Sequence, residues 1–157
     1  MTPLPFDLGD ESSIAAAAAR CGADGPLHLV VVATGVLHDG AALQPEKSWR
    51  ALTAPSLAES FAVNAIGPAL LAKHFLPLLA TGEKAVFAAL SARVGSIEDN
   101  RLGGWYSYRA SKAALHMLIR TFAIELARRN PTALCVALHP GTVDTALSQP
   151  FQAGVPA

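Results

Sequence analysis

Two residues whose types and spacing suit acid–base chemistry, Tyr108 and Lys112, lie four positions apart in the run 106–112, Tyr-Ser-Tyr-Arg-Ala-Ser-Lys. On a helix, residues four apart lie on one face and contact each other. An ammonium beside a phenol favours the phenolate, so we expect Lys112 to lower the pKa of Tyr108 from its usual ~10. A general acid works best when its pKa lies near the ambient pH. The pair therefore predicts a proton donor, although the same spacing also occurs on plain helix surfaces.

Three apolar runs predict the strands that would position this pair, at residues 27–33, 84–90 and 133–138. Their β-branched, continuous character is typical of parallel strands buried on both faces. A further short run at 4–8 is a weaker strand candidate because prolines interrupt it.

Helical patterns separate these runs. Ser12 or Ser13 is expected to cap a helix that runs to Arg20, and longer helices are expected at 56–79 and 105–129, with loops at 34–54 and 92–104. The alternation of strands and helices predicts an α/β fold with a doubly wound parallel sheet. Right-handed crossovers should place both long helices on the same face of that sheet.

Three motifs resemble those of the short-chain dehydrogenase/reductase family. The run 108–115, Tyr-Arg-Ala-Ser-Lys-Ala-Ala-Leu, resembles the family's active-site helix, 61–68 (Phe-Ala-Val-Asn-Ala-Ile-Gly-Pro) its asparagine segment, and 139–145 (His-Pro-Gly-Thr-Val-Asp-Thr) its Pro-Gly loop. Residues 95–97 and 107–109 are most similar to the C-factor and sniffer-type carbonyl reductase branch. The resemblance implies an NAD(P)-dependent oxidoreductase that acts on a small carbonyl or alcohol substrate.

Pro68 lies inside the first long helix, where it removes one backbone hydrogen bond and clashes with the carbonyl four residues earlier. That carbonyl belongs to Asn64, so the sequence predicts a helix distortion there. By resemblance, Asn64 would complete a proton relay with Lys112 and Tyr108.

The family's carbonyl-polarising serine is expected at the end of the strand before the active-site helix. Ala92 occupies the expected position and Ser91 the one before it, and neighbours on a strand point to opposite faces. Ser91 is the first candidate, Ser96 the second, and the absence of any such serine stays open.

The resemblance also assigns a cofactor site. Its expected residues are Asp7, Ala33, Gly35, Tyr108, Lys112, Pro140, Gly141, Val143 and Thr145. Asp7 rests on one short match and is equally well a surface aspartate. The loop at 140–145 follows a strand at its carboxyl end, where ligands bind in open α/β sheets.

The family's glycine-rich phosphate turn has no counterpart in the sequence. Aligned by its motifs, the chain corresponds to a single Rossmann-like domain, 1–157, that lacks the first two strands and the last strand. The run 27–33 would then form an exposed apolar edge. We expect little cofactor affinity or turnover from this chain alone. The alternative is a non-catalytic remnant that folds and associates through its two long helices.

Composition limits the other classes of function. The chain has 157 residues, 52% hydrophobic and 15% charged, with 12 basic and 12 acidic side chains, so we expect a folded core and neither nucleic-acid nor membrane binding. Two cysteines and five histidines show no metal-ligand spacing. These features predict a cytoplasmic protein with no metal. Apolar positions on the two long helices predict a homodimer, the assembly that the resemblance also implies.

Overall fold

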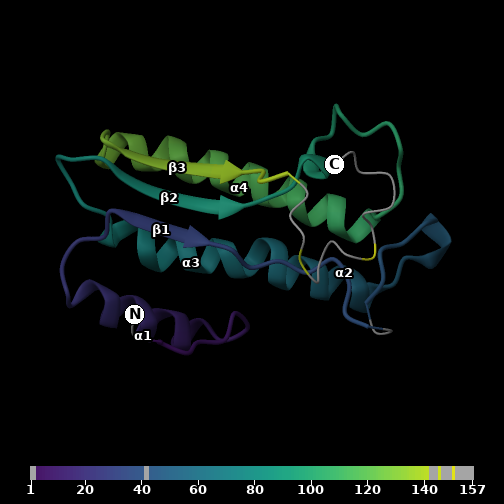
Figure 1. Cartoon of the computed structure of the whole chain (residues 1–157), viewed down its shortest axis with the longest axis horizontal. Coiled ribbons are helices and arrows are strands. Elements are labelled where there is room, and N and C mark those ends of the chain that lie inside the picture. Colours follow the sequence, from purple (N-terminus) through teal and green to yellow (C-terminus); the bar gives the residue numbers. More distant parts are fainter. Residues whose placement is uncertain (1–2, 41–42, 142–144, 146–149, 151–157) are drawn as a thin grey trace.

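The computed structural model describes residues 3–40, 43–141, 145 and 150. Its sheet contains β1 (Leu29–Val32), β2 (Ala85–Leu90) and β3 (Ala133–Leu138). The strands are parallel and ordered β1-β2-β3, as predicted, and Val31, Ala88 and Val136 lie side by side across them. Figure 1 shows the three arrows running in the same direction, so their carboxyl ends meet at one edge of the sheet.

The helices are α1 (Glu11–Gly22), α2 (Ala54–Phe61), α3 (Gly67–Phe75) and α4 (Tyr106–Arg129). A π-helical turn, Ala62–Ile66, joins α2 to α3, and 3-10 turns lie at Trp49–Ala51, Leu76–Leu78 and Arg93–Gly95. The helix predicted at 56–79 is thus a nearly continuous helical segment with a distortion next to Pro68. The other long helix matches its predicted range to within one residue.

One face of the sheet packs against α3 and α4 to form the core. Phe87 at the centre of β2 is fully buried and shares a cluster with Phe75 of α3 and Leu115 of α4. Ile14 brings α1 into the same cluster. Figure 1 shows α3 and α4 lying along the sheet and α1 outside α3. Both long helices therefore lie on one face, as right-handed crossovers require.

The opposite face of the sheet is largely uncovered by the described residues. Leu29 and Val31 of β1 are 64% and 53% exposed, and Leu134 and Leu138 of β3 are about half exposed. The expectation that residues 27–33 are buried on both faces was wrong, because β1 is an edge strand and no helix of the described residues covers this side. The exposed apolar edge expected at residues 27–33 is present, because β1 is the first strand of the described sheet.

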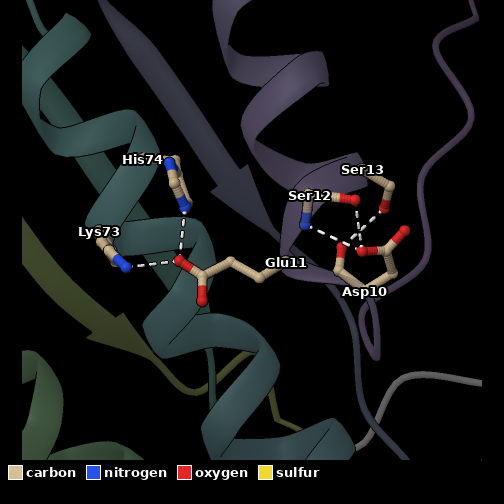
Figure 2. A network of polar contacts seen from close by, with 6 residues as sticks. All are labelled: Asp10, Glu11, Ser12, Ser13, Lys73 and His74. Carbon is tan, nitrogen blue, oxygen red and sulfur yellow. Dashed lines mark hydrogen bonds and ion pairs between the residues drawn. The ribbon is translucent and has the colours of Figure 1, made fainter.

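The start of α1 is fixed by Asp10 rather than by Ser12 or Ser13. The Asp10 side chain accepts a 2.9 Å hydrogen bond from the Ser12 amide, which makes Asp10 the N-cap. Glu11 then reaches α3, where it contacts Lys73 at 2.5 Å and His74 at 2.9 Å (Figure 2). Residues 4–8 form no strand and lead into this cap.

One helical stretch, Ala54–Leu78, has the length and mean hydropathy (1.2) of a membrane span. The core helix of a soluble protein passes the same test, and here α3 buries Leu71, Ala72 and Phe75 against the sheet and α4. Core packing therefore accounts for part of the apolar character of this stretch.

Candidate active site

A cavity of about 650 Å³ opens at the carboxyl ends of the three strands. Its wall comes from four segments: the end of β1 and the following loop, the end of β2, the first turns of α4, and the loop after β3. This is the edge at which open α/β sheets bind ligands, because strand ends and helix starts meet there.

Tyr108 and Lys112 both line this cavity from one face of α4. Tyr108 is 8% exposed and Lys112 3% exposed. The Lys112 Nζ lies 5.7 Å from the centroid of the Tyr108 ring and donates a 3.2 Å hydrogen bond to the Leu90 carbonyl oxygen. The structure thus brings the two residues together in the wall of the cavity at the strand ends.

Burial sets the acid–base properties of the pair. Desolvation lowers the pKa of Lys112 to about 8, and it raises the pKa of Tyr108 above its ordinary value. The expected lowering of the Tyr108 pKa by Lys112 was therefore wrong for the protein without a ligand. The cause is the burial of the phenol itself, because desolvation disfavours its charged form.

Asn64 lies in the π-helical turn before Pro68, and its side chain is fully buried. Its Nδ2 donates to the Val36 carbonyl at 2.8 Å and to the Ser111 hydroxyl at 3.2 Å, while its Oδ1 accepts from the Val36 amide at 2.8 Å. One amide group therefore fastens the loop after β1 to α4. The helix distortion that Pro68 predicts is present, and it carries the residue assigned to the relay.

Ser91 directly follows β2 and lines the cavity, but its hydroxyl has a partner. Its Oγ lies 2.7 Å from Nε2 of His116 on α4. Desolvation and the nearby Lys112 charge lower the pKa of His116, so the ring is neutral at pH 7 and can accept or donate this bond. Ser96 does not line the cavity, and its hydroxyl accepts the Asp99 amide instead. Ala92, at the position expected for the serine, does line it.

The residues expected to bind a cofactor divide into three groups. Ala33, Gly35, Pro140, Gly141 and Thr145 line the cavity together with Tyr108 and Lys112. Asp7 lies in the turn before α1, where its side chain accepts the Gly9 amide at 2.7 Å, and it is not among the lining residues. Val143 lies outside the described residues.

Thr34, which the sequence analysis did not select, adds a polar group to the cavity wall. Its Oγ1 is buried and has no hydrogen-bond partner, although the residue lines the cavity. Buried hydroxyls are normally paired, so an unpaired one beside a cavity indicates a group that a ligand can satisfy. In the sequence, this residue could have been recognised as a polar side chain that directly follows the apolar run 27–33.

The nicotinamide end of a dinucleotide fits this arrangement. Thr34 offers an unpaired hydroxyl, and at Gly35 an added Cβ would lie 3.5 Å from both Asn64 Oδ1 and Lys112 Nζ, in space that glycine leaves open. Among the lining residues there is no glycine-rich turn of the kind that receives a pyrophosphate. In the described part of the chain, no group of three or more His, Cys, Asp or Glu side chains is placed to hold a metal ion.

Comparisons with known proteins identify the family of this chain. The family model described as short chain dehydrogenase matches residues 1–155. C-signal of Myxococcus xanthus is 40% identical over 94 residues, which are 60% of this chain and 55% of that protein. The 1-hydroxy-2-glutathionyl-2-methyl-3-butene dehydrogenase of Rhodococcus sp. (strain AD45) is 40% identical over 89 residues, 57% of this chain and 38% of that protein.

Two solved structures show the same fold. The carbonyl reductase Sniffer of D. melanogaster superposes with a TM-score of 0.79 at 27% identity, covering 91% of this chain and 60% of that one. The NADPH-bound carbonyl reductase from chicken fatty liver gives 0.76 at 34% identity, covering 92% and 59%. The chain thus spans about 60% or less of each of these four proteins, and it belongs to the short-chain dehydrogenase family.

Proposed function

We propose that this chain carries the catalytic half of an NAD(P)-dependent oxidoreductase site for a small carbonyl or alcohol substrate. The observation that carries the proposal is the pair Tyr108 and Lys112, buried side by side in the wall of a cavity at the strand ends. Family membership and the NADPH-bound carbonyl reductase with the same fold support it. Because the chain spans only part of its relatives, the activity of a complete enzyme is part of the proposal.

In the proposed reaction, Tyr108 donates its phenolic proton to the carbonyl oxygen of the substrate. NAD(P)H, when bound, supplies the hydride that the carbonyl carbon needs to become an alcohol. Lys112, with its pKa lowered to about 8, is charged at neutral pH and can return a proton to the phenolate. Ala33, Thr34, Gly35, Pro140, Gly141 and Thr145 would hold the nicotinamide end.

Asn64 and Ser91 have supporting roles in this proposal. Asn64 holds the Val36 backbone beside Gly35, which keeps the cofactor side of the cavity in register with α4. Ser91 polarises the substrate carbonyl only if its hydroxyl donates into the cavity while accepting from His116, a geometry that the neutral His116 ring permits.

Reduced nicotinamide mononucleotide provides a test that does not depend on the phosphate end of a dinucleotide. We expect this probe to shift the amide resonances of Thr34, Gly35 and Gly141 in a two-dimensional NMR titration. Lys112→Met should abolish these shifts, whereas the exposed Lys84→Met should not. Shifts that are unchanged in Lys112→Met, or that map elsewhere, would contradict the site.

The complete dinucleotide should bind poorly to this chain. The missing phosphate contacts are charge-assisted hydrogen bonds worth about 1.5–3 kcal/mol each, so losing two or three weakens binding by about 10³ or more. We expect no micromolar affinity for NADPH in a fluorescence titration. Micromolar binding would contradict this expectation and would imply that another chain supplies the phosphate site.

We further propose that the protein is a cytoplasmic homodimer. Met117 and Ile124 of α4 are 68% and 45% exposed, and Ile66 between α2 and α3 is 53% exposed, so both long helices present apolar side chains to solvent. A self-complementary contact through these helices would cover them. Light scattering should give twice the chain mass for the wild type, and Met117→Lys should shift the measured mass toward that of the monomer. A wild-type monomer at high micromolar concentration would contradict the dimer.

The cytoplasmic part of the proposal is supported by the cysteines. Cys21 and the buried Cys135 are both free, as suits a reducing compartment.

A further inference from the structure

The helix that carries Tyr108 begins without a cap of its own. Its N-cap residue, Trp105, has the left-handed backbone φ of 54° and makes no side-chain capping bond. Trp105 is the one non-glycine residue with positive φ in the described part of the chain. The first turn of a helix leaves its N–H groups without intrahelical partners, so this start needs support from elsewhere.

Glu46 supplies that support from the loop between β1 and α2. Its Oε2 accepts the Ser107 amide at 3.1 Å, and its Oε1 accepts the Ser107 hydroxyl. Its backbone carbonyl accepts the Trp105 amide at 2.6 Å. Three bonds from one residue, 61 positions upstream of Ser107, therefore hold the two residues at the beginning of α4.

Glu46 is 5% exposed, which is rare for a carboxylate. The nearest compensation is the helix itself, because the amino end of α4 carries partial positive charge and free N–H donors. A buried carboxylate bonded there gains charge-assisted hydrogen bonds and neutralises the helix end. The bonds are thus directional and shielded from water, which fixes the position of the turn.

The turn that Glu46 holds is part of the cavity wall. Trp105 lines the cavity, and its ring packs edge-on against Tyr108 with centroids 6.3 Å apart. Tyr108 directly follows Ser107. We propose that Glu46 is a positioning residue for Tyr108: by fixing Trp105 and Ser107, it sets where the phenol enters the cavity. The inference rests on the proposed role of Tyr108 as proton donor, and adds a residue that does not itself face the substrate.

The test follows the Tyr108 phenol directly in the full-length chain. Tyr106→Phe leaves one tyrosine, so a ¹³Cζ-tyrosine label reports only Tyr108 during a pH titration. Glu46→Ala removes the carboxylate that accepts both Ser107 bonds but keeps the backbone carbonyl that accepts the Trp105 amide. We expect the Tyr108 phenol to become more exposed and its raised pKa to move toward about 10. Exchange of the Ser107 amide should accelerate at least tenfold relative to that of Ile119 in the middle of α4.

Matched variants separate positioning from general destabilisation. Glu46→Gln keeps an oxygen acceptor for Ser107 and should restore most of the amide protection and the phenol titration. Glu59→Ala, which removes an exposed glutamate of α2, should change neither. If Glu46→Ala does not fold, Ser107→Ala removes only the hydroxyl contact and gives the same local comparison.

An unchanged Tyr108 titration in folded Glu46→Ala, or a loss of protection that is uniform along α4, would overturn the positioning role. Neither readout needs a cofactor or turnover. Failure here therefore stands apart from failure of the proposed oxidoreductase site, which the nicotinamide mononucleotide titration tests.

Discussion

Replacing Lys112 by methionine should stabilise the protein, and by an amount that depends on pH. Lys112 is 3% exposed, and the pKa of its ammonium is about 8 in the folded chain against an ordinary value of 10.5. Below pH 8 Lys112 is protonated in both the folded and the unfolded chain, and burying its charge lowers the free energy of unfolding. Between pH 8 and 10.5 the unfolded chain binds more protons, so the stability of the wild type rises with pH in that window.

The magnitude follows from the two pKa values. A difference of about 2.5 pKa units corresponds to about 3 kcal/mol at pH 7, and the remaining penalty at pH 10 is below about 1 kcal/mol. Methionine has a similar shape and no charge to desolvate. The bond to the Leu90 carbonyl is lost, which offsets about 1–2 kcal/mol of the gain.

The assay is urea unfolding, followed by circular dichroism, of the wild type and Lys112→Met at pH 7, 8.5 and 10. Taking the difference between the two proteins at each pH cancels the titration of other groups, including Tyr108 and Cys135. We expect the advantage of Lys112→Met to shrink by about 2 kcal/mol from pH 7 to pH 10. The exposed Lys84→Met is the control and should show no such trend. A constant difference across this range would refute the reasoning that burial lowers the Lys112 pKa.

Three other substitutions test the packing around the site. Asn64→Ala leaves the Val36 amide and carbonyl unpaired and should lower the free energy of unfolding by about 3 kcal/mol in urea denaturation; a loss under about 1 kcal/mol would show that Asn64 does not hold the loop. Gly95→Ala places a Cβ 2.9 Å from the Lys112 backbone carbon and 3.0 Å from the His116 ring. We expect about 2 kcal/mol of destabilisation and a shifted His116 ring resonance, and an unshifted resonance would contradict this contact. Leu29→Lys on the exposed strand β1 should change the free energy of unfolding by less than about 0.5 kcal/mol and should reduce aggregation in light scattering. Equal aggregation of the variant and the wild type would show that β1 is not the surface that drives aggregation.

The features that the sequence predicts well are those with a local cause. Three β-branched or alanine-rich runs become the three parallel strands, because each run is long enough to define a strand by itself. Pro68 predicts a helix distortion wherever the helix packs, since the missing N–H is a property of the residue. Tyr108 and Lys112 lie on one face of α4 because residues four apart in a helix always do, whatever the helix packs against.

The features that the sequence does not predict depend on competition among similar residues, on burial or on distant partners. Asp10 outcompetes Ser12 and Ser13 as the N-cap, although all three are good capping residues. The burial of Tyr108 raises its pKa, and no spacing rule reports how deeply a side chain is enclosed. Ser91 meets His116 and Ser107 meets Glu46 only after the chain has folded, because these partners are 25 and 61 positions apart.

Two serine contacts on α4 explain how the site is held in place. Ser107 and Ser111 are four residues apart, and each directly precedes a residue of the pair Tyr108 and Lys112. The two serines therefore lie on one face of α4, next to the face that carries the tyrosine and the lysine. The serines bond toward the loop after β1, through Glu46 and Asn64, while the tyrosine and lysine line the cavity. The loop that contributes Gly35 and Thr34 to the cavity is therefore fastened to the helix that contributes the proton donor. This arrangement keeps the two walls of the site in register, even though the described residues leave one face of the sheet beneath them largely uncovered.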